Sequence, residues 1–471
     1  MISLKGCDFE EEGCIVLQKG NDLGRDSVGR LVLRLAIPTM IAQFVNILYS
    51  IIDRMYIGNI PKIGDLALAG VGICGPVVTL LGSFGTLIGL GGSILMAMRQ
   101  GEKNEKRARQ LMSNSFLLLV IVSAILTVSF LLLKNRLLMW FGASEVTFVY
   151  ADTYMTIYTI GTFFALMALG LNYFITCQGF STVGMATVLT GAITNIILDP
   201  IFIFVFDMGV AGAAIATVIA QMLSCLFAMG FLFSKNVPIG ICFGNYSLKT
   251  MVKIMSVGFS PFLILATDSA IILVTNAVLQ KYGGPGQGDL LISGATIVQS
   301  YMMLITGPML GISGGTQAIL SYNYGARQTA RVKKAERCIL LLCLGFTTVM
   351  FLITRVAAPY FVRIFTERGE LFDLAVWGIG IFTLAVVPLS FQYVFVDGLT
   401  ALGRTKTALT LSLFRKISYT VLTILLPAFF TAKAAFYAEP IVDVLSATAS
   451  TITFLMVIGN HLKKREQLEI V

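Results

Sequence analysis

Charged residues are scarce in this sequence. Of its 471 residues, 13% are Asp, Glu, Lys or Arg, whereas a soluble domain carries roughly 25%. Histidine occurs once, at position 461, which argues against His-based catalysis and zinc chemistry. The eight cysteines form no Cys-x-x-Cys pair, and most lie in apolar stretches, so we interpret them as small apolar residues. This composition excludes an ordinary soluble domain.

Hydrophobic residues are abundant instead. They make up 56% of the chain, the mean hydropathy is +0.85, and apolar runs of about 20 residues recur, each long enough to cross about 30 Å of hydrocarbon. We predict an all-α membrane protein with twelve transmembrane helices. Their predicted positions are 31–57, 67–97, 111–133, 148–177, 184–206, 209–233, 256–280, 290–320, 338–361, 374–402, 406–430 and 436–460. Residues 1–30 contain no apolar signal-peptide core, so the first span is expected to direct insertion.

The net charge of +9 is distributed unevenly between the two ends of these helices. If the first segment is cytoplasmic, the loops on that side hold 23 Lys and Arg, and the opposite loops hold 8. The positive-inside rule then predicts a cell-membrane protein with both termini in the cytoplasm. The basic loops are expected to face anionic lipid headgroups, not nucleic acid.

The two halves of the sequence resemble each other at a constant spacing of 224 positions. The matching motifs are ALAGVGI and LISGATI (Gly70 and Gly294), MRQGEKNEKRAR and YNYGARQTARVK (Gly101 and Gly325), and CQGFSTVGMA and ALGRTKTALT (Gly179 and Gly403). We therefore predict two six-helix lobes related by a pseudo-two-fold axis, with a cavity between them, as in alternating-access transporters. The predicted segments are a cytoplasmic N-terminal segment 1–30, a first lobe 31–233, a cytoplasmic linker 234–250, a second lobe 251–460 and a cytoplasmic tail 461–471.

The first predicted span carries a polar stripe. Its members, spaced so that they share one helical face, are Gln43, Asn46, Ser50 and Asp53. Such a face must meet protein or water, because polar side chains are costly in lipid. Gln43 and Asn46 are candidates for a substrate cavity. Asp53 with Arg54 is alternatively explained as a structural pair at the helix end.

The fifth predicted span places an acid beside a proline. Asn195 and Asp199 share a helical face, and Pro200 cannot donate a hydrogen bond to the carbonyl of Ile196, which loosens the backbone there. Further polar residues of the first half are Tyr154, Asn172, Thr217 and Gln221. A single one of them is explained as readily by helix packing. Two carboxylates with several amides predict a site for a proton or a cation.

Four motifs of the first half carry a family resemblance. They are SIIDRMYIG, NYFITCQG, NIILDPIFIF and GVAGAAIAT. They resemble the MATE (multidrug and toxic compound extrusion) family, in its DinF-like/MepA-like branch, and the resemblance extends over about residues 30–460. It implies that the protein uses a coupling ion, H⁺ or Na⁺, and no cofactor. The implied H⁺ or Na⁺ ligands are Asp53, Tyr154, Asn172, Asn195, Asp199 and Thr217, with Tyr154 left out of the set for Na⁺.

The second half departs from this pattern. Its eleventh span, FRKISYTVLTILLP, has no acid where the fifth span has NIILDP. We interpret Asp268 and Asp397 as cavity acids that attract cationic substrates. Glu439 and Asp443 are also explained as a solvated helix start near the outer surface.

Three functions are compared. The leading one is a monomeric antiporter, surrounded by membrane lipids, that exports amphipathic or cationic drugs. A flippase for a lipid-linked precursor should offer cations to a pyrophosphate, but few Lys and Arg lie within predicted spans, among them Arg54, Arg415 and Lys416. An intramembrane aspartyl enzyme, which would use a pair of Asp residues, does not explain the internal repeat. We therefore expect a transporter and not an enzyme.

Overall fold

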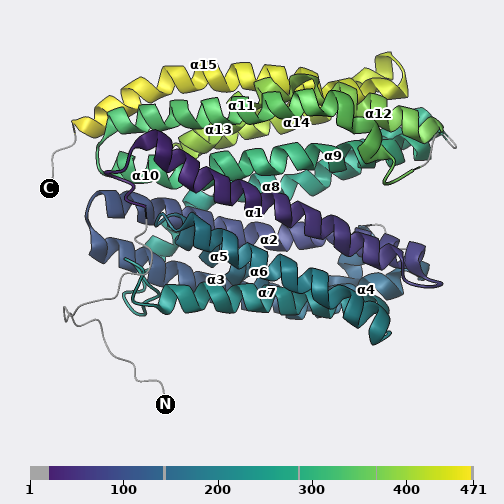
Figure 1. Ribbon diagram of the computed structural model, residues 1–471, viewed down its shortest axis with the longest axis horizontal. Helices are drawn as coiled ribbons and strands as arrows, with labels where there is room; N and C mark the ends of the chain where they lie inside the picture. The colour runs from purple at the N-terminus through teal and green to yellow at the C-terminus, as the bar shows by residue number, and fades with distance from the viewer. Residues whose placement is uncertain (1–20, 142–144, 285–286, 367–368, 468–471) are drawn as a thin grey trace.

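The computed structural model describes residues 21–141, 145–284, 287–366 and 369–467, and within these residues it contains helices and no strands. Long helices lie side by side (Figure 1). The helices are α1 (Val28–Gly58), α2 (Gly64–Gly101), α3 (Glu105–Trp140), α4 (Glu145–Ile160), α5 (Thr162–Thr176), α6 (Ser181–Pro200), η1 (Ile201–Val205), α7 (Gly209–Phe233), α8 (Leu248–Gly283), α9 (Gln287–Gly315), α10 (Gln317–Gly325), α11 (Thr329–Val362), α12 (Glu370–Phe382), η2 (Thr383–Ala385), α13 (Val386–Ala401), α14 (Thr405–Phe429), η3 (Ala432–Tyr437) and α15 (Ala438–Glu466).

The number of membrane-spanning helices agrees with the prediction. Within the described residues, 11 helices are long and apolar enough to cross a membrane, and α4 with α5 makes a twelfth span that is bent by 56°. Gly161 lies at this bend, and a methyl group there would come within 2.8 Å of the Val218 side chain on α7. Glycine therefore lets α7 pack closely against the break. The predicted all-α membrane fold is confirmed.

The fifth span changes its helical geometry directly after the acid. α6 ends at Pro200, and the π-helical turn η1 continues the span. A proline has no N–H to donate to the carbonyl four residues earlier, so the regular hydrogen-bond ladder is interrupted here. The predicted loosening of the backbone therefore takes the form of a short π-helical segment next to Asp199.

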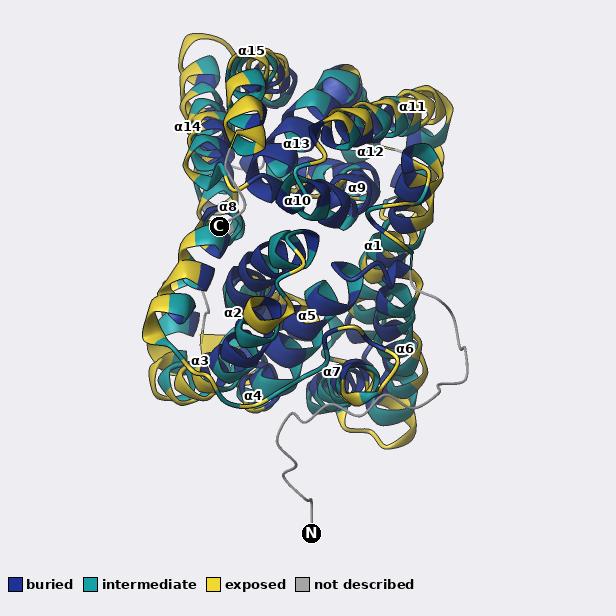
Figure 2. Cartoon of the chain, turned by 90° about the vertical axis from the view of Figure 1, so that its left-hand side faces the viewer, coloured by how far each residue is buried: buried dark blue, intermediate teal, exposed yellow. Residues whose placement is uncertain are grey.

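The helices gather in two groups. Viewed from the end (Figure 2), α2 to α7 form the lower group and α9 to α15 the upper group. α1 packs on both α6 and α9, and α8 packs on α2, so α1 and α8 join the two groups. The α2–α8 contact is close: a methyl group at Gly91 would lie 2.7 Å from the backbone nitrogen of Gly258.

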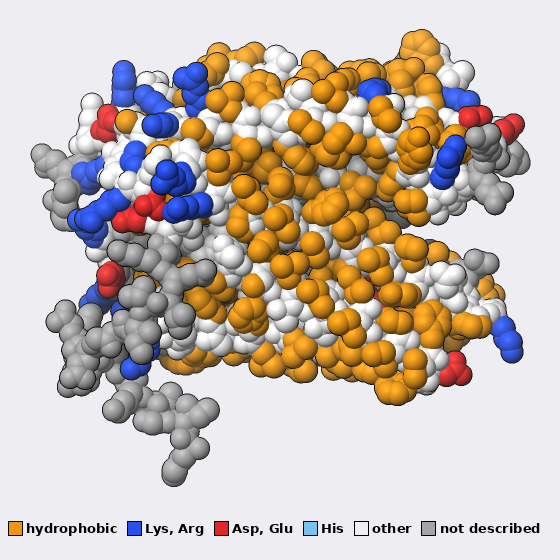
Figure 3. Space-filling model, in the orientation of Figure 1, with side chains coloured by type: hydrophobic (Ala, Val, Ile, Leu, Met, Phe, Trp, Pro, Cys, Tyr) orange, Lys and Arg blue, Asp and Glu red, His pale blue; other side chains and the backbone are white. Residues whose placement is uncertain are grey.

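The two ends of the molecule differ in charge and in closure. Lys and Arg side chains gather at one end, the flanks between the ends are hydrophobic, and the opposite end is hollowed between the two groups (Figure 3). At the basic end α10 packs on α2, and a methyl group at Gly101 would lie 2.8 Å from the backbone nitrogen of Ala326. The groups are therefore in backbone contact at the basic end and separated at the other.

Candidate functional site

The two predicted acids of the first half meet across the α1–α6 interface. Asp53 and Asp199 are 146 positions apart in sequence (199 − 53), yet their side chains interact directly. Asp199 is fully buried. Asp53 Oδ1 and Asp199 Oδ2 are buried atoms without a hydrogen-bond partner of ordinary geometry. Two carboxyl groups so close together cannot easily both carry a charge.

Asn195 and Thr217 complete the polar group around Asp199. The Asn195 amide donates hydrogen bonds of 3.0 Å to Asp199 Oδ1 and 3.3 Å to Thr217 Oγ1. The Tyr154 hydroxyl also lies near Thr217. Asn195 and Asp199 belong to α6 and Thr217 to α7, so the packing of these two helices assembles the group. The carbonyl oxygen of Asn195 is buried and has no partner.

A second polar pair extends the cluster toward α4. Tyr158 stacks on Tyr154 with ring centroids 6.1 Å apart, and the Gln221 amide donates a 3.3 Å hydrogen bond to the Tyr158 hydroxyl. Sequence reasoning did not place Tyr158 in the site. Its spacing of four residues from Tyr154, the same as that of Gln221 from Thr217, was the available signal.

The cluster has the chemistry of a site for a proton or a small cation. Its carboxylates, amide carbonyl and hydroxyls are hard oxygen donors, and three of the oxygens, on Asp53, Asn195 and Asp199, have no hydrogen-bond partner. In the part of the chain that the structure describes, no group of three or more His, Cys, Asp or Glu is placed to hold a metal ion. A Na⁺ ion here would therefore depend on the amide and hydroxyl oxygens as well as the two acids.

Asn172 does not join this cluster. Its amide donates hydrogen bonds of 2.7 Å to the Gly184 carbonyl and 2.5 Å to Thr187 Oγ1. Thr187 lies eight residues before Asn195 on α6 (195 − 187), or roughly 12 Å along the helix. The structure thus separates Asn172 from the acids with which it was predicted to share an ion. Gln43 and Asn46 lie about three and about two turns before Asp53 on α1 and are half-buried and exposed, respectively.

Five in-span charges of the second half form two ion-paired groups. Lys416 on α14 pairs with Asp268 on α8, and Arg415 lies 2.7 Å from Glu439 and 2.8 Å from Asp443 on α15. Asp443 is completely buried. The alternative of a solvated helix start is therefore wrong for Asp443, whose charge is compensated by the partly buried Arg415.

Asp397 lies apart from these ion pairs. It belongs to α13, and Ser313 on α9 donates a 2.6 Å hydrogen bond to its Oδ2. Its role as an acid that attracts cationic substrates stays a prediction, as does that of Asp268.

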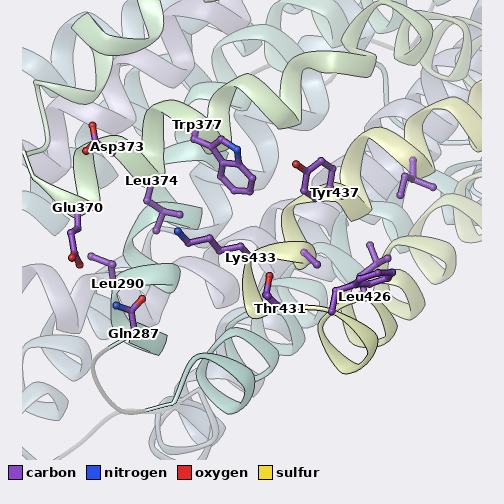
Figure 4. A pocket seen from close by; sticks show the side chains of 13 residues that line it. Gln287, Leu290, Glu370, Asp373, Leu374, Trp377, Leu426, Thr431, Lys433 and Tyr437 are labelled. Carbon is purple, nitrogen blue, oxygen red and sulfur yellow. The ribbon is translucent and has the colours of Figure 1, made fainter.

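A cavity of about 1010 Å³ opens in the second half at the end away from the basic residues. Side chains of α9, α12, α14, η3 and α15 surround it, and Figure 4 shows Trp377 and Tyr437 on one side of Lys433 and the acids Glu370 and Asp373 on the other. Aromatic faces and carboxylates attract organic cations, and a volume of this size accepts a drug-sized molecule.

Comparisons with known proteins agree on one family. A family model described as MatE matches residues 38–201 and 269–426. Multidrug export protein MepA of Staphylococcus haemolyticus (strain JCSC1435) is 23% identical over 431 residues, covering 91% of this chain and 92% of that protein. MepA of Staphylococcus saprophyticus is 22% identical over 415 residues, covering 88% and 89%. A solved structure of a multidrug resistance MATE family transporter in an outward-facing conformation has a similar fold, with a TM-score of 0.88, 23% identity and coverage of 96% of this chain and 100% of that one.

Proposed function

The chain belongs to the MatE family, whose model matches more than half of its length, and from this premise we propose that it is a multidrug efflux antiporter. It exports amphipathic, often cationic compounds across the cell membrane, and inward movement of H⁺ or Na⁺ drives the export. The observation that carries the proposal is the pair of the half-buried Asp53 and the fully buried Asp199, with the Asn195 amide beside it. An apolar helix bundle keeps such a pair only at a cost, which a coupling function explains.

The coupling step follows from the position of the two acids. When a cation or proton neutralises one carboxylate, the repulsion between Asp53 and Asp199 disappears and α1 can approach α6. When the cation leaves, the repulsion returns. Since α1 also packs on α9 of the other half, a change in how α1 meets α6 is transmitted to the contact between the halves.

The transport path fits drugs with an apolar body and a positive charge. The hollow between the halves opens at the end that is poor in Lys and Arg (Figure 3), which the positive-inside rule assigns to the outside. The cavity with Trp377, Glu370 and Asp373 lies at that end. The described conformation is thus the outward-open one, in which a cation enters and a drug leaves. Two six-helix halves make a complete path, so a monomer suffices.

The flippase alternative is disfavoured by the partners of the in-span cations Arg415 and Lys416. A site for a lipid pyrophosphate needs cations that are free to meet phosphate oxygens. Arg415 is occupied by Glu439 and Asp443, and Lys416 by Asp268. The three acids outnumber the two cations, so this region carries a net negative charge, which suits an organic cation better than a phosphate.

Ethidium transport in everted vesicles tests the proposal. A pH gradient and a Na⁺ gradient are imposed separately, and ethidium fluorescence is followed in vesicles with and without the protein. We expect uptake of ethidium into everted vesicles with one of the two gradients and none in protein-free vesicles. Uptake that neither gradient alters, or no uptake with either, would exclude an ion-coupled exporter of this class.

A further inference from the structure

Two carboxylates of the second half lie together and take no part in the cluster around Asp199. Glu336 belongs to α11 and Asp397 to α13, helices that pack against each other (Figure 2). The Glu336 carboxylate abuts the backbone of Gly398, the residue after Asp397: a methyl group at Gly398 would lie 2.8 Å from Glu336 Oε2. The position of Gly398 therefore leaves room for the Glu336 carboxylate beside Asp397, and the two acids interact electrostatically.

The two acids differ in their hydrogen bonds. Ser313 donates a 2.6 Å hydrogen bond to Asp397 Oδ2, and the Gln317 side chain also lies beside Asp397. Glu336 is 6% exposed, and both of its carboxylate oxygens are buried without a hydrogen-bond partner, as is the carbonyl oxygen of Gln317. Across the described residues, the ion pairs include no Lys or Arg bound to Glu336 or Asp397. A buried acid in such surroundings lacks any protein group to compensate its charge.

The group lies inside the membrane-spanning part, near the basic end. Glu336 is seven residues from Thr329, the first residue of α11 (336 − 329), or roughly 10 Å along the helix. Gln317 is the first residue of α10, and it also lines a small cavity between the two halves, opposite Tyr173 and Thr176 of α5. The group therefore stands next to the contact that closes the basic end.

We propose that Glu336, Asp397, Ser313 and Gln317 form a second binding site for a small monovalent cation, H⁺ or Na⁺. The unpartnered oxygens of Glu336 and Gln317 and the carboxylate of Asp397 supply the oxygen donors that such a cation takes. A bound cation removes the uncompensated charge that makes the empty site costly. This site extends the proposed function. It rests on that function for one point: in an antiporter, the site would let a second cation move through the half that does not contain Asp199.

Cation binding to the purified full-length protein tests the site without any transport step. ²²Na⁺ bound per chain is measured in one arm. In the other arm, protons taken up per chain are measured in K⁺ buffer as the pH is lowered from about 8 to about 6, above the range in which an exposed carboxylate titrates. Both arms use the wild type, Glu336→Gln, Asp397→Asn and the control Glu105→Gln, which removes an exposed acid at the same end. All are repeated in an Asp199→Asn background, which silences the first-half site.

We expect Glu336→Gln and Asp397→Asn each to lose one bound cation per chain in the arm whose cation the site takes, in both backgrounds, while Glu105→Gln behaves as the wild type. Loss in the Na⁺ arm identifies a sodium site, and loss confined to the proton arm identifies a proton site. If either Glu336→Gln or Asp397→Asn elutes as an aggregate, the result for the other variant decides. Unchanged stoichiometry in both arms overturns the proposal of a second site. It does not bear on ethidium export, which the vesicle experiment tests, so the two hypotheses fail separately.

Discussion

Glu102 and Arg465 form an ion pair that joins the two halves at the basic end, although 363 positions separate them in sequence. Glu102 follows α2 and Arg465 lies near the end of α15, and their side chains are 23% and 15% exposed. Arg99 binds the other carboxylate oxygen of Glu102. Arg465 also donates hydrogen bonds of 3.1 Å to the Tyr324 carbonyl and 3.2 Å to the Gly325 carbonyl. This network spans the place where the halves meet backbone to backbone.

Glu102→Gln should weaken closure of the basic end. The substitution removes a partly buried charge pair, so we expect the open–closed equilibrium to shift by about 1–2 kcal/mol toward opening. The measurement is the distance between spin labels at Lys106→Cys and Lys334→Cys, exposed positions of the two halves at this end, in a background without native cysteines. The control is Asp26→Asn, which removes the exposed pair with Arg34. An equal shift in both variants would show that the Glu102 pair has no special role.

The same pair predicts a dependence on pH. Burial alone would raise the pKa of Glu102, but hydrogen bonds from Arg465 and the charges of Arg99 and Arg465 outweigh it, so its pKa in the closed state lies below the ordinary 4.5. The closing contribution is therefore complete above that ordinary value and is lost as the pH falls through the depressed one. We expect the spin-label distance to contain a component below pH 4.5 that Glu102→Gln abolishes. A Glu102-dependent component between about pH 6 and 8 would contradict this assignment.

Much of this fold was predictable because helix length and polarity follow from local sequence. The twelve spans and the shared faces of Asn195 with Asp199 were expected from periodicity, and both occur. The bend at Gly161 was missed, since the fourth span is apolar on both sides of it and its cause is the packing of α7.

The contacts between helices were harder to predict than their positions. Lys416 and Asp268 pair across 148 positions, and Asn172 bonds Thr187 instead of the acids. Neither follows from spacing within one helix, because the rotation of each helix against its neighbour decides which polar faces meet.

Asp199→Asn should insert and fold but lose coupled efflux. An amide keeps the size of the side chain and the bond to Asn195, but it cannot exchange a proton or balance a cation, so we expect a roughly tenfold or larger loss of gradient-driven ethidium transport. The matched control is Asp207→Asn, an exposed acid just after the same span, at a position with φ of 53° that asparagine tolerates. Resistance and transport at the wild-type level in Asp199→Asn, at equal expression, would refute the coupling role.

Asp268→Asn should destabilise the protein through Lys416. Lys416 is 8% exposed and would keep a buried charge without its partner, although Asp268 itself is half-exposed. We expect a loss of about 1–3 kcal/mol, seen as a lower unfolding temperature in detergent. The double variant Asp268→Asn/Lys416→Met should recover most of it.

Dye binding to that double variant separates stability from substrate recognition. If Asp268 attracts cationic substrates, ethidium should bind more weakly to the stable double variant, while a neutral dye should bind as before. Equal binding of both dyes would assign Asp268 to the ion pair alone. If Asp268→Asn alone is as stable as the wild type, the argument that Lys416 needs a partner for its buried charge is wrong.

Asp53 and Asp199 should bind their cation as one unit. Their carboxyl groups interact across the α1–α6 interface, so the occupancy of one sets the charge that the other can hold. A double-mutant cycle with Asp53→Asn, Asp199→Asn and both variants together, read out as the affinity for H⁺ or Na⁺, should give a coupling energy of about 1–3 kcal/mol. The control cycle pairs Asp53→Asn with Asp207→Asn, just beyond the span that carries Asp199, and should be additive. If the Asp53–Asp199 cycle is additive as well, the two acids bind independently, and the repulsion that we assign to α1 movement does not operate.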